Sequence, residues 1–247
     1  MKLLKYLFIL PLILGVIAFV AVKVMSEKMP EASPSLEADA LADTVMNSLG
    51  KAAFDTIPYL SWEFFRPGQK YFWDKRQNNA VIEWEDNKVI MDLDSQAARS
   101  YVAGVAQEGA DHEKLKQKAW SNWCNDSFWL IAPFKMKDRG TVRKLVSIEN
   151  SDNRGLLVEY VSGGVTPGDS YLWEIGSDNR PVSWKMWTQI LPVKGMMSPW
   201  DGWENHMGAQ LSTKHAILGK EVTMKDVKAG NDWSDFGYKT DPFSELR

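Results

Sequence analysis

The chain has 247 residues, of which 45% are hydrophobic and 25% are charged. These values are typical of a folded globular body, and they exclude a disordered chain or a protein with many membrane spans. The net charge is −3 and the basic residues are scattered among acidic ones. A nucleic-acid partner is therefore not expected, because phosphate binding needs clustered lysine and arginine.

Tryptophan is unusually frequent, with 12 residues, whereas the chain has one cysteine, Cys124. Each indole brings a large apolar area and one N–H donor, so this number indicates either an aromatic core or an aromatic-lined concavity. A single cysteine cannot form an internal disulfide. Cys124 also lies too far along the chain to be the lipid-modified first residue of a lipoprotein.

The first predicted element is an apolar helix over residues 1–25. Lys2 and Lys5 precede an uncharged run from Tyr6 to Val22. A helix of that length can just span a bilayer core of about 30 Å if the flanking lysines reach the interfaces. No small-x-small cleavage site follows closely, which favours an uncleaved transmembrane signal-anchor over a cleaved signal peptide. The charged N-terminus predicts a single-pass protein of the cell (inner) membrane whose body is extracytoplasmic, in the periplasm.

A polar, proline-bearing linker is predicted at 26–35, and the folded domain follows it. Apolar residues at helical spacing predict an amphipathic helix at 36–49, with Ser35 as its N-cap and Gly50 just past its end. The period then changes to two, which is typical of half-buried strands. Strands are predicted at 60–64, 70–75, 82–84, 89–93 and 99–106, and the short turns between the first four indicate an antiparallel meander.

A second helix is predicted at 111–125, with Trp120, Trp123 and Cys124 on one side, and an apolar stretch at 128–132 ends at Pro133. Further strands are predicted at 142–149, 155–161, 170–176, 182–191, 209–218 and 221–227. Pro and Gly at 167 and 168 predict a type II turn. The sum is one α+β domain of about ten strands and two helices over 36–230, with a C-terminal tail at 231–247.

The order of these elements and two short motifs resemble the bacterial lipoprotein-carrier (LolA/LolB-like) superfamily. The motifs are Asn125-Asp126-Ser127-Phe128-Trp129-Leu130-Ile131-Ala132-Pro133 and Val165-Thr166-Pro167-Gly168-Asp169, followed by Tyr171-Leu172-Trp173 and Pro181-Val182-Ser183-Trp184. The resemblance implies a curved, mainly antiparallel half-barrel with the helices against its concave side, where an acyl chain can be held without catalytic residues. The chain departs from the founding members in its predicted membrane anchor, and no arginine matches a known ligand-gripping position.

No motif in the sequence predicts an enzyme or a cofactor. A Gly-x-Ser-x-Gly elbow, a phosphate-binding glycine loop and a dinucleotide fingerprint are all missing. Asp201, Glu204 and His206 are the one candidate metal set, but their spacing matches no closed zinc site, so 200–206 is interpreted as a polar loop and no metal is expected. Cys124 lies beside tryptophans and is interpreted as a structural thiol.

Alternating aromatic residues form the predicted binding surface, because they should point to the covered side of their strands. The candidate cleft residues are Trp62, Phe64, Trp84, Trp173 and Trp184. Phe72 lies between Tyr71 and Trp73, which predicts aromatic groups on both faces of one strand. The sequence thus predicts a membrane-anchored binding protein that holds a lipid or other apolar small molecule in an aromatic-lined cleft. The alternative is a non-catalytic structural or interaction domain of the cell envelope, whose helices fill the concavity.

Overall fold

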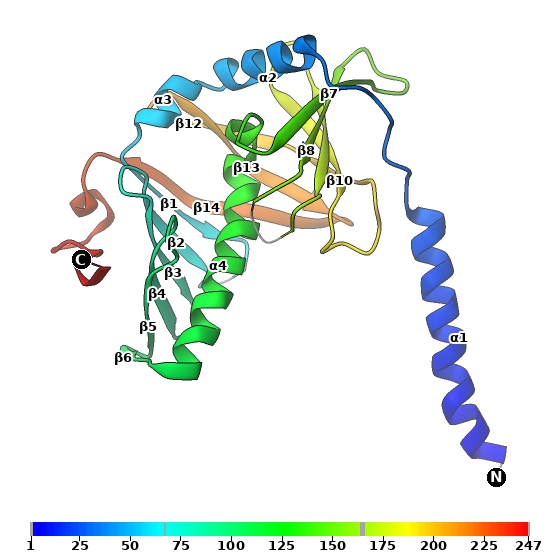
Figure 1. The fold of residues 1–247 in the computed structure, drawn as a ribbon, viewed down its shortest axis with the longest axis horizontal. Helices are drawn as coiled ribbons and strands as arrows, with labels where there is room; N and C mark the ends of the chain where they lie inside the picture. Colours follow the sequence, from blue (N-terminus) through cyan, green and yellow to red (C-terminus); the bar gives the residue numbers. More distant parts are fainter. Residues whose placement is uncertain (1, 67, 164–165, 247) are drawn as a thin grey trace.

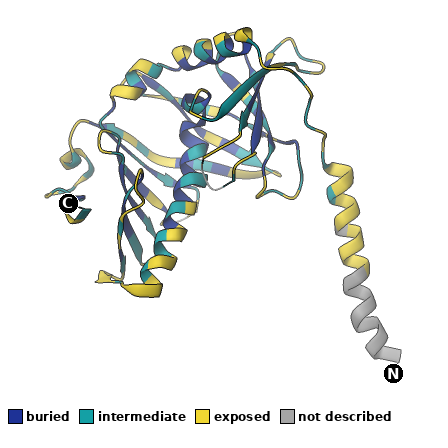
Figure 2. Cartoon of the chain, in the orientation of Figure 1, coloured by how far each residue is buried: buried dark blue, intermediate teal, exposed yellow. Residues whose placement is uncertain are grey.

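The computed structural model describes residues 2–66, 68–163 and 166–246, with side chains from residue 13 onward except residue 18. Helix α1 (Lys2–Met25) stands apart from a body made of two antiparallel sheets (Figure 1). Its described side chains are mostly exposed (Figure 2). Within the part of the chain whose side chains are described, no helix is long and apolar enough to cross a membrane. Much of the predicted transmembrane run, residues 6–12 and 18, lies outside those described side chains.

The segment between α1 and the body is held at both ends. The Glu27 amide donates a hydrogen bond to the carbonyl oxygen of Lys194 at 2.9 Å, and Trp187 Nε1 donates to the Glu27 carbonyl oxygen at 2.9 Å. Further along, Pro34 forms an isolated bridge with Lys144. Residues 26–35, predicted to be a linker, thus contact the body rather than run freely through solvent.

The larger sheet has nine strands in the described part of the chain, in the order β12-β13-β14-β1-β2-β3-β4-β5-β6. The strands are β1 (Tyr59–Phe64), β2 (Lys70–Asp74), β3 (Asn79–Trp84), β4 (Asn87–Asp92), β5 (Ala98–Val102), β6 (Val105–Ala106), β12 (Asp201–His206), β13 (Ala209–Ile217) and β14 (Lys220–Gly230). The predicted strand 99–106 is divided because Ala103 and Gly104 both have positive φ, as a tight hairpin turn requires.

The smaller sheet has five strands, in the order β11-β10-β9-β8-β7. They are β7 (Thr141–Ser147), β8 (Arg154–Tyr160), β9 (Ser170–Ile175), β10 (Pro181–Trp187) and β11 (Met196–Pro199). The predicted turn before β9 is present: the Asp169 amide donates to the Thr166 carbonyl oxygen at 3.3 Å, and Gly168 has a φ of +99°. Residue 165, which opens the second motif, lies outside the described residues.

Two helical regions cover different sheets. Helices α2 (Leu36–Ser48) and α3 (Lys51–Thr56) follow each other, and α2 packs on β7 and β8. Ser35 caps α2 by accepting a hydrogen bond from the Ala38 amide at 3.1 Å, as predicted. The long helix α4 (Gly109–Ile131) instead packs on β4, β5 and β13. It continues into the short helix η1 (Ala132–Lys135) and thus includes most of the stretch 128–132 that was predicted separately.

The larger sheet is apolar on both faces. Its inner face shares the main core with α4 and the smaller sheet, whereas Tyr59, Phe72 and Phe243 belong to a second core on the outer face. The C-terminal segment, with η2 (Trp233–Phe236) and η3 (Ser244–Leu246), covers that second core. Tyr71 and Phe72 therefore point to opposite faces of β2, which confirms the prediction of aromatic groups on both faces of a strand.

The mainly antiparallel α+β prediction is confirmed, and both sheets are open rather than closed into a barrel. The architecture differs from a single half-barrel of about ten strands, since the described residues form fourteen strands in two sheets. The predicted polar loop 200–206 is the edge strand β12. An edge strand with exposed residues on both faces shows no apolar alternation, which is why its sequence resembles a loop.

Candidate functional site

A cavity of about 690 Å³ lies between the two sheets and beside α4. This volume falls within the range of about 300 to 1,000 Å³ that is usual for small-ligand pockets. Helix α4 contributes much of the lining, through Trp120, Trp123, Cys124, Phe128 and Trp129. Trp123 and Cys124 follow Trp120 by three and four residues and Phe128 follows Cys124 by four, so these four share one side of the helix. Trp129 lies further round. The two helices therefore do not fill the space between the sheets.

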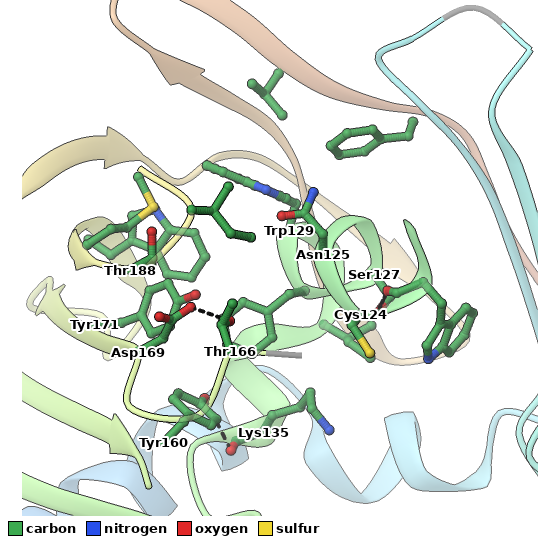
Figure 3. A pocket seen from close by; sticks show the side chains of 18 of the residues that line it. Cys124, Asn125, Ser127, Trp129, Lys135, Tyr160, Thr166, Asp169, Tyr171 and Thr188 are labelled. Carbon is green, nitrogen blue, oxygen red and sulfur yellow. Dashed lines mark hydrogen bonds between the residues drawn. The ribbon is translucent and has the colours of Figure 1, made fainter. Parts of the chain in front are cut away.

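An aromatic cluster joins α4 to the smaller sheet along one wall of the cavity. The ring centroid of Phe128 lies 5.3 Å from that of Tyr160, 4.9 Å from that of Tyr171 and 5.8 Å from that of Trp184. Tyr171 and Trp184 are buried, at 9% and 1% exposure. Figure 3 shows Tyr160 and Tyr171 on the opposite side of the cavity from Cys124. The wall thus offers wide apolar surfaces in fixed positions.

The five candidate cleft residues are placed differently with respect to this cavity. Phe64 and Trp184 line it, whereas Trp62, Trp84 and Trp173 are not among its lining residues. Trp62 is buried and stacks on Tyr71, with ring centroids 5.0 Å apart. Trp173 is fully buried behind Trp184, at 4.8 Å between centroids. Period-two alternation correctly indicates the covered face of a strand, but it does not indicate depth within the core.

Sequence reasoning missed much of the lining because it searched the strands. Trp120, Trp123 and Phe128 come from α4, and Thr188 and Leu191 come from the loop between β10 and β11. The helical residues had a usable signal, since their spacing defines one face of the predicted helix. The loop residues had none, because a loop without periodicity does not predict which side chains point inward.

The lining also contains polar side chains, and two of its residues each have a buried polar atom without a partner. Trp184 Nε1 and Thr188 Oγ1 are buried with no hydrogen-bond partner among the described residues. Burial raises the pKa of the Cys124 thiol to about 12. The thiol is therefore protonated at neutral pH and is not an activated nucleophile. The aromatic part of the wall can therefore accommodate the apolar atoms of a ligand.

Asp126 fixes α4 from behind the cavity wall. Tyr71 Oη donates a hydrogen bond to Asp126 Oδ2 at 2.5 Å, and the Gln69 amide also donates to this oxygen. Asn125 Nδ2 donates to the other carboxyl oxygen at 2.7 Å. Burial raises the pKa of Asp126 despite these hydrogen bonds. The motif residue Asp126 thus connects α4 to β2 and holds the lining face of the helix in place.

The candidate metal set does not converge. Glu204 and His206 lie two residues apart on β12 and so share a face, with His206 Nε2 at 3.5 Å from Glu204 Oε2. Asp201 is an odd number of residues from both and points to the other face. The described residues hold no group of three or more His, Cys, Asp or Glu side chains that could bind a metal ion.

These features define an open, two-sheet α+β fold that encloses an aromatic-lined cavity. A DUF1329 family protein from Desulfovibrio piger ATCC 29098 is similar over 81% of this chain and 96% of its own, with 11% identity and a TM-score of 0.43. A putative outer membrane lipoprotein-sorting protein domain from Vibrio parahaemolyticus is similar over 81% of this chain and 97% of its own, with 7% identity and a TM-score of 0.36. No protein-family model and no curated protein matches the chain. Likenesses this distant do not carry a function to it.

Proposed function

We propose that this protein binds a lipid or another apolar ligand in the cavity between its two sheets. The observation that carries the proposal is a space of about 690 Å³ that remains open beside α4 and has an aromatic wall. A filled core would leave no such space, because protein interiors pack closely and voids larger than a water molecule are few. Apolar ligands gain free energy from such a cavity by leaving water, with aromatic rings supplying the contact area.

The positions of the aromatic residues suggest their roles in the proposed site. Phe64 and Trp184 are proposed to touch the ligand, together with Phe128. Trp62 and Trp173 are proposed to support the wall, because they are buried behind lining residues. No catalytic step is proposed. Cys124 has a raised pKa, so it is not an activated nucleophile, and the carboxyl group of Asp126 is already engaged in hydrogen bonds.

We further propose that α1 tethers the protein to the inner membrane, with the body in the extracytoplasmic space. This proposal is supported by the uncharged run in the sequence of α1 and by the exposure of its described apolar side chains. They include Ile13, Leu14, Val16, Ile17, Phe19 and Val20, at 48% to 63% exposure. Apolar side chains that are exposed in this way need another apolar environment to leave water.

Native mass spectrometry with lipid extraction tests the ligand proposal on the full chain, purified from a membrane-bearing host. Leu191→Asp places a carboxylate at the cavity wall from a loop, where the fold tolerates change. Met197→Asp, at a 55% exposed position of β11 that does not line the cavity, is the matched control. Lipid retained by wild type and Met197→Asp but lost from Leu191→Asp would support the proposal. Circular dichroism checks that both variants fold.

The absence of bound lipid would contradict the ligand proposal. Wild-type protein that carries no lipid from any of several hosts, and that takes up none when lipid is added, would overturn the ligand proposal. The interaction-domain alternative would then be preferred. Membrane fractionation of the full chain, compared with a variant that has three aspartates in α1, tests the tether separately.

A further inference from the structure

The entrance of the cavity is basic although the chain as a whole is acidic. Arg66, Arg139 and Lys220 all line the cavity and are exposed. They come from three separate places: the turn after β1, the turn before β7 and the start of β14. Their exposure places these cationic groups at the solvent-facing part of the lining, whereas Trp129 and Trp184 in the same lining are buried.

These three cations have no carboxylate within ion-pair distance among the described residues. The fourth cation of the lining, Lys135, pairs with Asp138, so neither is available to a ligand. Asp169 accepts hydrogen bonds from the Thr166 hydroxyl at 2.6 Å and from the Gln189 amide at 2.8 Å. Glu221 is the remaining carboxylate of the lining. The exposed part of the lining thus has three cations without an ion pair and one carboxylate, Glu221, whereas Asp169 is 5% exposed.

We infer that the ligand is a single-chain amphiphile with an anionic head, such as a carboxylate or a phosphate. This inference rests on the proposed function, because it assigns the head group of the same ligand. The chain would lie against Phe128, Tyr171 and Trp184, and the head would remain at the opening near Arg139 and Lys220. A cavity of about 690 Å³ has the size expected for one ligand of this class. Guanidinium and ammonium groups are suited to such heads, since they form charge-assisted hydrogen bonds with carboxylates and phosphates.

The charge pattern also determines what should bind poorly. A neutral head of equal size would gain the apolar contacts but no charge interaction. A cationic head would be repelled by the three unpaired groups. Exposed ion pairs are individually weak, so the cationic groups at the opening should together favour an anionic head by roughly tenfold in Kd over a neutral head. Salt should weaken this preference, because the groups at the opening are exposed.

The test uses four amphiphiles whose alkyl chains have eleven or twelve carbons: dodecanoate, dodecyl phosphate, dodecanol and dodecyltrimethylammonium. Binding to the full chain is measured by tryptophan fluorescence below the concentrations at which they form micelles. We expect both anions to bind about tenfold more tightly than dodecanol at low salt, and the cation to bind most weakly. Comparing dodecanoate with dodecyl phosphate distinguishes a carboxylate ligand from a phosphate ligand.

Variants separate the charge effect from the apolar effect. The double variant Arg139→Gln, Lys220→Gln should bind dodecanol like wild type and lose most of the preference for anions. Lys239→Gln is the matched control, because it removes an exposed charge from the C-terminal segment, away from the cavity lining. Equal affinity for the four amphiphiles, or tighter binding of the cation, would overturn the anionic head but leave the apolar site intact. If none of them bound, the proposed function itself would fail.

Discussion

His215 should make the stability of the fold fall in mild acid. This residue of β13 is 3% exposed and lies between two tryptophans, with ring centroids 5.4 Å from Trp129 and 4.4 Å from Trp200. Its Nδ1 lies 3.2 Å from the carbonyl oxygen of Pro199, and its Nε2 has no partner among the described residues. Burial lowers the pKa of His215 from 6.5 to about 4, although hydrogen bonds to the backbone oppose the shift.

The sign and size of the effect follow from proton linkage. As the pH falls below 6.5, the unfolded chain binds a proton at His215 before the folded chain does, so the free energy of unfolding decreases. Between pH 7 and pH 5 the loss from this group is about 2 kcal/mol, and it approaches about 3 kcal/mol near pH 4. The proton would have to enter a site where Nε2 has no acceptor.

Urea denaturation followed by tryptophan fluorescence at pH 7 and pH 5 measures this loss. His215→Asn keeps an N–H donor near the position of Nδ1 but does not titrate, so its free energy of unfolding should fall by about 2 kcal/mol less than that of wild type. His112→Asn is the matched control and should retain the wild-type dependence, because His215 is still present. If His215→Asn and wild type lost the same free energy between the two pH values, the reasoning about His215 would be refuted.

Three further predictions concern Lys75, Asp126 and Cys124. Burial lowers the pKa of Lys75 to about 8. The free energy of unfolding of wild type should therefore rise from pH 8 to pH 10 relative to Lys75→Met, by about 1 kcal/mol after allowance for solvent screening, in paired urea denaturations. Asp126→Ala removes the acceptor of the Tyr71 O–H, although the Tyr71 oxygen still accepts from Gln69 Nε2 at 2.8 Å. The variant should lose about 2 kcal/mol by the same method and Asp126→Asn should lose less; equal losses would exclude the hydrogen bond as the cause. Because burial raises the pKa of Cys124 to about 12, its thiol should react with a disulfide reagent at pH 8 at least about 100-fold more slowly in the folded chain than in urea, measured by absorbance.

Local sequence patterns correctly predict the strands with period-two alternation and the helix with clear capping residues. The period-two residues around Trp62 and Ile82 predict strands, and Ser35 and Gly50 correctly bound the first body helix and its cap. Gly50 has a φ of +77°, and a Cβ there would lie 2.2 Å from the carbonyl oxygen of Gly208. A side chain at that corner is therefore excluded by contact as well as by backbone conformation.

Long-range packing is not visible in such patterns. Nothing in the sequences of β10 and β13 indicates that the strands divide into two sheets. The same residues could form antiparallel pairs in one continuous sheet or in two. The candidate residues show the same limit. Trp173 and Trp184 are register partners on β9 and β10 and both face inward, yet Trp184 lines the cavity and Trp173 does not. The position of Trp184 depends on Phe128 and Trp129 of α4, which pack against it and lie more than 50 residues earlier in the sequence.

The contacts of Glu27 give the N-terminal helix an energetic connection to the cavity. Glu27 is hydrogen-bonded to Lys194 and Trp187, and Lys185 Nζ lies 2.6 Å from its carboxylate. Detaching Glu27 from the body would break these hydrogen bonds, at a cost of about 1 kcal/mol for each. The loop between Trp187 and Lys194 also places Thr188 and Leu191 in the cavity wall. Detachment of Glu27 and loosening of this loop disrupt the same hydrogen bonds. The two events are therefore thermodynamically coupled, and each lowers the free-energy cost of the other.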